Sequence, residues 1–247
     1  ATWADVARRI AHEIKNPLTP IQLAAERLKR KFLREITSDP ETFRLCADTI
    51  VRQVSDIGRM VDEFSAFARM PQPRMAEENL SSIIRDSLIL QQGAHPEIRY
   101  DVTLPPSGPM VSCDRRQIGQ TLTNLLQNAA DAIAMTGRSV NTDEKSGQIL
   151  SVGVISVAVS EFDDRVRITI SDDGVGLPQE DRDRLTEPYV THKPKGTGLG
   201  LAIVKKIMED HEGTVELRDR PAGAGTEATR ILLPKAGAQK VYHGVWN

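Results

Sequence analysis

Residues 41–68 read ETFRLCADTIVRQVSDIGRMVDEFSAFA, and the apolar positions in this stretch recur at alternating spacings of four and three residues. Such spacing places the apolar side chains on one face of an α-helix, as in helices that pack in a bundle or coiled coil. The positions concerned are Phe43, Ala47, Ile50, Val54, Ile57, Val61, Phe64 and Ala68. The stretch therefore predicts a long amphipathic helix, and it decides the architecture of the first part of the chain.

The segment before this helix carries a matching apolar stripe, formed by Ala7, Ile10, Ile14, Ile21, Ala24 and Leu28. Between the two stripes, Ser38-Asp39-Pro40-Glu41 offers a capping side chain followed by proline at the first helical position, which is a typical helix start. Residues 3–35 and 40–69 are therefore predicted to form an antiparallel helical hairpin. Two helices leave much apolar surface uncovered, so we expect a homodimer in which two hairpins form a four-helix bundle.

Met70-Pro71-Gln72-Pro73 ends the second helix and opens a linker. Beyond it, helical patterns at 80–92, 115–134 and 199–212 are interspersed with strand patterns at 98–104, 152–159, 166–171, 214–218 and 226–233. Helices and mostly antiparallel strands in this order predict an α+β sandwich with one layer of each. The predicted organisation is a helical domain at 1–70, a linker at 71–79, an α+β domain at 80–235 and a tail at 236–247.

The composition excludes several classes of protein. The chain has 247 residues, 39% of them hydrophobic and 4% aromatic, with 32 Lys and Arg against 34 Asp and Glu. A formal net charge of -2 offers no general attraction to polyanions, so we expect no nucleic-acid partner. Because no apolar run approaches the roughly 20 residues that span a bilayer, we expect no direct membrane contact. Two distant cysteines, Cys46 and Cys113, match neither a disulfide framework nor a CxxC motif.

Three polar patterns in the second domain occur in sites that bind phosphate-containing ligands. Asp172-Asp173-Gly174-Val175-Gly176 follows a predicted strand, although alone this pattern more often marks a plain β-turn. The run from Lys193 to Gly200, KPKGTGLG, leads into a helix that would offer backbone N–H groups to phosphate, but it is neither a Walker A nor a Rossmann motif. Asn124 and Asn128 lie one turn apart on the long helix, either as a surface pair or as ligands of a hydrated divalent cation.

Taken in order, these patterns resemble the N, G1 and G2 boxes of the GHKL ATPase superfamily. Gly223-Ala224-Gly225-Thr226 is similar to its G3 box, and Glu187-Pro188-Tyr189-Val190-Thr191 is similar to its F box. The resemblance implies a GHKL (Bergerat) α/β sandwich, with a mixed, mostly antiparallel sheet, that binds ATP and Mg²⁺. The residues that it implies at the nucleotide are Asn124, Asn128, Asp172, Gly174, Gly176, Lys193, Lys195, Gly196, Thr197, Gly198, Leu199, Gly200 and Thr226.

The resemblance also implies a role for individual residues in that set. Asp172 accepts a hydrogen bond from the adenine amino group, and Thr226 lies on the opposite side of the base. Asn128 ligates Mg²⁺. Lys193 and Lys195 cover the phosphates as part of a lid. The residue after Asn128 is alanine, whereas a Lys or Arg is common there in the superfamily, so phosphate neutralisation should depend more strongly on the two lysines.

The first helix contains a second informative segment, residues 10–20, with the sequence IAHEIKNPLTP. A lone histidine on a helix is usually a solvated or half-buried structural residue. However, His12 lies about 200° around the helix from Ile10 and from Ile14, so it faces away from the apolar stripe. Pro17 and Pro20 each remove a backbone amide. We therefore expect the helix to bend or loosen just after His12.

Residues 10–20 resemble the H box of histidine kinases in its HExxN form, with a dimerisation and phosphotransfer domain ahead of the ATPase domain. The resemblance covers nearly the whole chain and is greatest to the nitrogen-regulation sensors of the NtrB/NtrY group. It implies that ATP phosphorylates His12, that Glu13 orients and deprotonates the imidazole, and that Asn16 positions water in a phosphatase reaction. The phosphoryl group would pass to an aspartate in the receiver domain of a response regulator. The chain would then be the cytoplasmic part of a membrane-anchored sensor.

Two other functions fit parts of the sequence. A GHKL ATPase could use hydrolysis to drive a conformational clamp, but it would need a catalytic glutamate on the helix of Asn124, where this chain has Gln120 and Gln127. A dimerisation module without kinase activity would show degraded nucleotide boxes, whereas these boxes are intact. Neither alternative predicts a phosphorylated histidine, so phosphate transfer to His12 separates them from the kinase.

Overall fold

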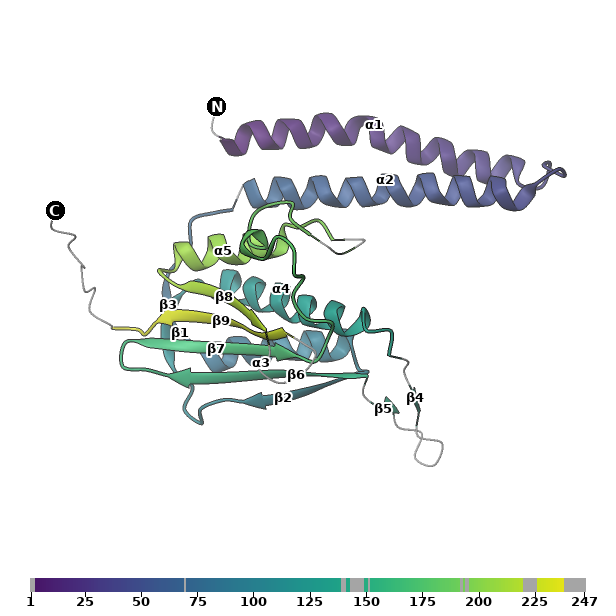
Figure 1. The fold of residues 1–247 in the computed structure, drawn as a ribbon. Helices are drawn as coiled ribbons and strands as arrows, with labels where there is room; N and C mark the ends of the chain where they lie inside the picture. Colours follow the sequence, from purple (N-terminus) through teal and green to yellow (C-terminus); the bar gives the residue numbers. More distant parts are fainter. Residues whose placement is uncertain are drawn as a thin grey trace. The chain divides into compact units, whose positions relative to one another are not determined.

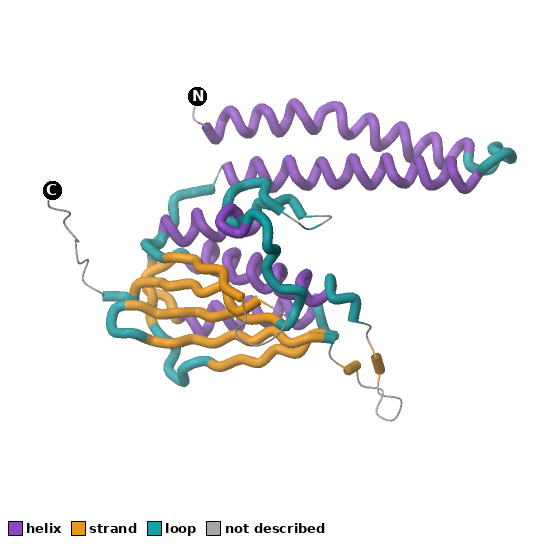
Figure 2. The backbone as a smooth tube through the Cα atoms, viewed as in Figure 1, coloured by secondary structure: helices purple, strands orange, loops and turns teal. Residues whose placement is uncertain are grey.

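The computed structural model describes residues 3–68, 70–138, 141–142, 149–150, 152–191, 193, 196–219 and 226–237. The chain divides into two compact units. One unit contains the residues up to Pro71 together with Thr191–Leu199, and the other contains Gln72–Val190 and the residues from Gly200 onward. The first unit is formed mainly by two long helices, and the second unit contains the sheets (Figure 2).

The helical unit is the predicted antiparallel hairpin. Helix α1 spans Trp3–Phe32 and helix α2 spans Pro40–Ala68, and the two lie side by side (Figure 1). The predicted start of α2 is confirmed, because Asp39 Oδ1 accepts a hydrogen bond from the backbone N–H of Thr42 at 3.0 Å. This carboxylate satisfies one of the amides that the first turn of a helix leaves without a helical partner.

Helix α1 continues through both of its prolines, Pro17 and Pro20. A proline inside a helix removes one hydrogen bond and crowds the carbonyl four residues earlier, so the ladder is weakened here without ending the helix. Neither α1 nor any other helix among the described residues combines the length and the apolar character needed to cross a membrane.

Two ion pairs join α1 to α2. Lys29 Nζ lies 2.5 Å from Asp48 Oδ1, and Lys15 Nζ pairs with Asp62 Oδ1. The spacing is fourteen residues on each helix, from Lys15 to Lys29 and from Asp48 to Asp62, which is close to four helical turns. The hydrogen bond from Lys29 lowers the pKa of Asp48. Exposed pairs of this kind contribute little to stability, but here they mark a single register of the hairpin.

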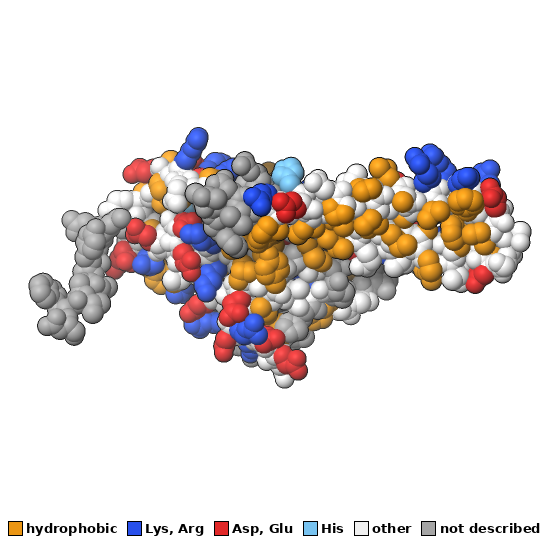
Figure 3. Space-filling model, turned by 90° about the horizontal axis from the view of Figure 1, so that it is seen from above, with side chains coloured by type: hydrophobic (Ala, Val, Ile, Leu, Met, Phe, Trp, Pro, Cys, Tyr) orange, Lys and Arg blue, Asp and Glu red, His pale blue; other side chains and the backbone are white. Residues whose placement is uncertain are grey.

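Among the hairpin residues whose burial is described, the buried side chains are small or slender, namely Ala11, Ala25, Ala47, Val54, Val61 and Ser65. The larger residues of the apolar stripes stay partly uncovered within one hairpin, in keeping with the expectation that two helices leave apolar surface open. These residues are between 39% and 46% exposed, and they are Ile10, Ile14, Ile21, Leu28, Ile50 and Ile57. The helices meet along rows of these small or slender residues, which allow close approach of the two axes. Hydrophobic side chains therefore lie open along the hairpin (Figure 3).

The second unit is built on a five-stranded sheet in the order β2-β6-β7-β9-β8. Strand β2 is parallel to β6, and the other neighbours are antiparallel, so the predicted mixed, mostly antiparallel sheet is confirmed. Phe162 N donates to Arg165 O at 2.8 Å in the predicted turn between β6 and β7. The strands span Ile98–Thr103 (β2), Gly153–Glu161 (β6), Arg165–Asp172 (β7), Thr214–Asp219 (β8) and Thr226–Pro234 (β9).

Three helices cover one face of this sheet (Figure 1), namely α3 (Leu80–Ala94), α4 (Arg115–Ala134) and α5 (Gly200–Asp210). Burial alternates along β6 and β7, because successive side chains of a strand point to opposite faces. The buried strand residues are Ile155, Val157, Val159, Val166, Ile168 and Ile170, and the helices contribute Leu122, Leu126, Ile133, Ile203 and Ile207. The core therefore lies between one sheet and one helical layer, as predicted for an α+β sandwich.

The structure also contains short strands for which the sequence shows no alternating pattern. Strand β1 pairs with β3 in an antiparallel ribbon, and β1 lies inside the stretch 71–79 that the sequence predicts to be a linker. Strands this short cannot display a period of two residues clearly. The remaining elements are β1 (Ala76–Asn79), β3 (Met110–Cys113), β4 (Asn141–Thr142), β5 (Ile149–Leu150) and the 3₁₀ turn η1 (Arg182–Arg184).

A buried polar junction at Asp114 ties the start of α4 to the end of α5. Asp114 Oδ1 accepts from the amides of Arg116 at 3.0 Å and Gln117 at 3.1 Å, and its Oδ2 accepts from Arg74 N at 2.8 Å. The Asp114 amide donates to Nε2 of the buried His211 at 2.9 Å. Because Nε2 accepts, the ring is neutral and its proton lies on Nδ1, which is 2.7 Å from Ile207 O.

Replacement of Asp114 by alanine should lower the free energy of unfolding by about 1 to 3 kcal/mol at pH 7, since a helix cap and several amide bonds are lost. Burial raises the pKa of the Asp114 carboxyl, but the amides of Arg74, Gln117 and Arg116 outweigh burial and hold the pKa below its ordinary value. Because folding lowers this pKa, the ionised carboxylate stabilises the folded state at pH values above the unfolded pKa of about 3.9. That stabilisation is lost as the pH falls through the pKa of the folded state.

Urea unfolding at pH 7 and pH 3 measures this effect. The difference between wild type and Asp114→Ala should shrink at the lower pH. Asp101→Ala is the control, because its carboxylate pairs with Arg99 at an exposed position on β2. An equal or larger difference at pH 3 would contradict an ionised, amide-bound Asp114.

Candidate functional site

The segment 172–176 leaves the end of β7 and turns against α4. Asp172 is buried, and its Oδ1 accepts from Gly174 N at 2.9 Å. Val175 N donates to Ala132 O at 3.1 Å. A Cβ on Gly174 would lie 2.4 Å from the carbonyl carbon of Ala132 and 2.7 Å from its Cβ. Only glycine therefore fits between this loop and the helix.

The last glycine of this segment has a different role. Gly176 has φ +82°, a left-handed conformation that glycine adopts without the steric cost of a side chain. The two predicted glycines therefore act in separate ways, Gly174 by close approach to α4 and Gly176 by backbone conformation.

One face of helix α4 carries both predicted asparagines and meets both glycine motifs. Asn124, Asn128 and Ala132 are spaced four residues apart and so form one row along the helix. At one end of the row, Asn124 Nδ2 donates to Gly200 O at 3.4 Å. At the other end, Ala132 contacts Gly174. The row thus connects the start of α5 with the loop after β7, with the half-buried Asn128 between them.

The row also shows which residue the sequence analysis missed. Ala132 forms the surface on which the loop of Gly174 lies, through both a backbone hydrogen bond and the close contact. The signal was present in the sequence, because a small residue four positions after Asn128 continues the same helical face. Its significance depended on knowing that a glycine lies opposite.

The segment 193–200 is only partly described. Helix α5 begins at Gly200, so the glycine-rich run does lead into a helix N-terminus. Gly198 has φ +71°, and a Cβ on Gly196 would lie 2.5 Å from Thr191 Oγ1. Leu199 is buried. The backbone conformation therefore favours glycine at 198, whereas at 196 a side chain would crowd the Thr191 hydroxyl.

Side-chain hydroxyls hold parts of this segment. Lys193 N donates to Thr191 Oγ1 at 3.1 Å, and Leu199 N donates to Thr197 Oγ1 at 3.4 Å. The Thr197 hydroxyl in turn donates to the carboxylate of Glu63 on α2. The segment Thr191–Leu199 accordingly groups with the helical unit.

Two predicted residues are described incompletely or not at all. Lys195 lies outside the described residues. Thr226 pairs with Asp219 at the end of the β8–β9 ladder, but its side chain is not described.

In the predicted F box, Tyr189 has φ +67°, an uncommon conformation for a residue with a side chain.

His12 lies on α1 as an exposed side chain. Glu13, the next residue, is also exposed, and its Oε1 accepts from Arg9 Nε at 3.1 Å. Asn16 lies about one turn further along and is exposed. An exposed imidazole can act as a nucleophile or accept a proton, so this part of α1 is suited to exchange of a group with a second molecule or domain.

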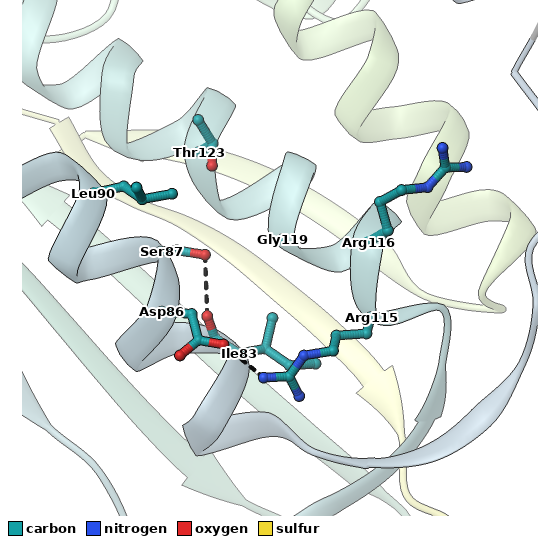
Figure 4. A pocket seen from close by; sticks show the side chains of 8 residues that line it. All are labelled: Ile83, Asp86, Ser87, Leu90, Arg115, Arg116, Gly119 and Thr123. Carbon is teal, nitrogen blue, oxygen red and sulfur yellow. Dashed lines mark hydrogen bonds and ion pairs between the residues drawn. The ribbon is translucent and has the colours of Figure 1, made fainter.

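A groove of about 370 Å³ lies between α3 and α4 (Figure 4). Arg115 spans one end of it, with Nη2 2.6 Å from Asp86 Oδ2 and 3.0 Å from Ser82 Oγ. Gly119 and Thr123 line the groove from a face of α4 that does not contain the asparagines. Its lining is Ile83, Asp86, Ser87, Leu90, Arg115, Arg116, Gly119 and Thr123.

Two family models match the chain. The His Kinase A (phospho-acceptor) domain matches residues 2–73, which include His12. The histidine kinase-, DNA gyrase B-, and HSP90-like ATPase family matches residues 113–237, which include the asparagine row and Asp172.

The chain is also similar to curated proteins. It is 56% identical over 225 residues to the nitrogen regulation protein NtrY of Azorhizobium caulinodans, covering 91% of this chain and 28% of NtrY. It is 34% identical over 242 residues to the sensor histidine kinase ZraS of Klebsiella oxytoca, covering 97% of this chain and 47% of ZraS. The chain therefore spans less than half the length of these two relatives.

Solved structures share the fold. The histidine kinase ThkA, crystallised in complex with the response regulator protein TrrA, has a TM-score of 0.61 and 26% identity over 94% of this chain and 61% of that chain. The mycobacterial sensor histidine kinase MprB has a TM-score of 0.54 and 27% identity over 65% of this chain and 97% of that chain. These comparisons agree with the helical hairpin and the α+β unit described above.

Replacement of Gly174 by alanine should destabilise the second unit by about 1 to 3 kcal/mol, because the new methyl group must displace backbone of α4. Gly119→Ala is the matched control, since a Cβ there meets nothing within 4 Å. On α4 this control should stabilise by up to about 1 kcal/mol. Thermal or urea unfolding measures both variants, and a Gly174→Ala protein as stable as wild type would contradict the close approach.

Proposed function

The chain belongs to the sensor histidine kinases, and we propose that it uses ATP to phosphorylate its own His12 and then passes the phosphoryl group to an aspartate of a response regulator. The observation that carries this proposal is the row Asn124, Asn128 and Ala132. It connects Gly200 with the loop of Gly174, so motifs distant in sequence meet along one helix, in the same chain as an exposed histidine.

The nucleotide is proposed to bind along this row. The buried carboxylate of Asp172, held by Gly174 N, would accept a hydrogen bond from the adenine amino group. Lys193 and Lys195 would neutralise the phosphates as part of the lid, together with backbone amides at the start of α5. Oriented amides at a helix N-terminus favour anionic oxygens.

Asn128 is the proposed protein ligand of Mg²⁺. Magnesium ions at nucleotide sites retain several waters and use one or two protein ligands together with phosphate oxygens. A half-buried amide on the asparagine row fits this donor set. The ion, when bound, would supply neutralisation of the charge that develops on the phosphates.

At the histidine, the proposed reaction requires a neutral imidazole. Nε2 of His12 attacks the γ-phosphorus, a P–N bond forms, and the bond from the γ-phosphorus to the bridging oxygen breaks to leave ADP. Glu13 is proposed to accept the Nδ1 proton. It would first leave Arg9, and because that pair is exposed, its loss costs little. Asn16 is proposed to position water when the regulator is dephosphorylated.

The proposed assembly is a homodimer, with the receiver domain of a response regulator as partner. The exposed apolar residues of the hairpin, among them Ile21 and Ile57, would be covered when two hairpins form a four-helix bundle. We also propose that the chain corresponds to the cytoplasmic part of a longer membrane-anchored sensor, in keeping with its coverage of 28% of NtrY.

Incubation of the chain with γ-labelled ATP and Mg²⁺ tests the kinase reaction. We expect label that survives base and is lost in acid, because a P–N bond is acid-labile, and we expect none in His12→Ala. Thr19→Ala, on the same helix, is the control that should retain label. Phosphate release without labelled protein would favour an ATPase clamp, and a chain that neither takes up label nor releases phosphate would favour a dimerisation module.

The dimer is tested by the mass of the protein in solution. Wild type should have about twice the mass of a single 27.3 kDa chain, whereas the double variant Ile21→Glu/Ile57→Glu should be monomeric, since charges cannot be buried unpaired in a bundle core. Leu45→Glu is the control, because Leu45 is 64% exposed and lies on the opposite side of α2 from Ala47. A wild-type monomer, or a dimeric double variant, would contradict the assembly.

A further inference from the structure

The end of α4 folds back over the loop that contains Asp172 and Gly174. Thr136 N donates to Ile133 O at 3.0 Å, and Gly137 N donates to Ala134 O at 3.2 Å. Gly137 has φ +69°, the left-handed residue that commonly ends a helix. The chain therefore reverses at this glycine, and the next residue is Arg138.

Arg138 binds three acceptors around the second aspartate of the loop. Its Nη1 donates to Asp173 Oδ2 at 2.8 Å and to Val152 O at 3.1 Å, and its Nη2 donates to the carbonyl oxygen of Asp173 at 2.8 Å. The other carboxylate oxygen of Asp173 accepts from Val154 N at 2.8 Å. A planar guanidinium can hold several acceptors in one fixed geometry, which an ammonium cannot.

These contacts hold the two residues that directly follow Asp172. Asp173 N also donates to Val154 O at 3.3 Å, so its main chain and side chain are both bound to β6. The next residue, Gly174, lies against Ala132. The two adjacent acids consequently differ in their surroundings, with Asp173 engaged by Arg138 and β6, and Asp172 buried.

We propose that Arg138 is a positioning residue for recognition of the adenine base. It does not touch the nucleotide in this proposal. It fixes Asp173, and through Asp173 the direction of the Asp172 carboxylate toward the 6-amino group. The inference rests on the proposed function, because it gives Arg138 a role in the nucleotide site assigned there.

The exposure of the pair makes the inference testable apart from stability. The side chain of Arg138 is 41% exposed and that of Asp173 is 25% exposed. Ion pairs this accessible add little to global stability. Loss of the guanidinium should therefore leave thermal unfolding nearly unchanged. It should, however, allow the loop to sample other orientations and so weaken the directional hydrogen bond between Asp172 and the 6-amino group.

The experiment measures the affinity of the chain, with Mg²⁺, for ATP and for purine riboside triphosphate, which lacks the 6-amino group. Wild type should prefer ATP by about tenfold or more, since a hydrogen bond to a buried carboxylate is lost with the analogue. In Arg138→Gln this ratio should fall at least about threefold, and Arg138→Lys should be intermediate. Asp173→Asn should reduce the ratio in the same way, and should add little to Arg138→Gln because both remove one interaction.

Arg99→Gln is the matched control. Arg99 also pairs with an aspartate, Asp101, at 3.1 Å, but on the exposed strand β2, so it should leave the ratio unchanged. An unchanged ratio in Arg138→Gln and Arg138→Lys would overturn the inference, as would a loss of melting temperature in both with the ratio retained. If wild-type protein binds ATP and purine riboside triphosphate equally well, the proposed hydrogen bond between Asp172 and the adenine amino group is overturned. This inference would then fail with it. The kinase reaction is judged separately by the label on His12.

Discussion

The close approach of Gly174 to Ala132 is the constraint on which the candidate site depends. A methyl group at Gly174 would lie 2.4 Å from a backbone atom of α4, so the loop after β7 can rest on the helix only because this side chain is absent. The contact aligns the loop with the row of Asn124 and Asn128. It also allows Arg138, one turn beyond the end of α4, to reach the neighbouring aspartate.

The helical unit follows a different rule. Small residues such as Ala11 and Ala47 are buried between α1 and α2, while larger stripe residues such as Ile21 and Ile57 are exposed. In a hairpin with this distribution, the surface between α1 and α2 is covered, whereas a second apolar surface stays exposed and is available for a partner. His12 is exposed on the same helix as Ile21, so the proposed phosphorylation site is accessible. In this unit the apolar surface that is suited to packing and the exposed His12 therefore lie at different positions.

Sequence periodicity was reliable where an element is long and has one apolar face. Helix α4 spans Arg115–Ala134 as predicted, and the α+β sandwich with its mixed sheet was predicted from the order of the patterns. It failed where elements are short, as in β1 and β3, because a few residues cannot display a period.

The motifs and their order were determined by the sequence alone, because residue type and spacing specify which groups share a helical face or follow a strand. Only the tertiary structure decided which of these groups meet. Ala132 became part of the site because Gly174 lies on it, and Arg138 because a left-handed Gly137 turns the chain back over Asp173. Such contacts join residues far apart in the chain, and the packing of α4 on β7, rather than any local preference, brings them together.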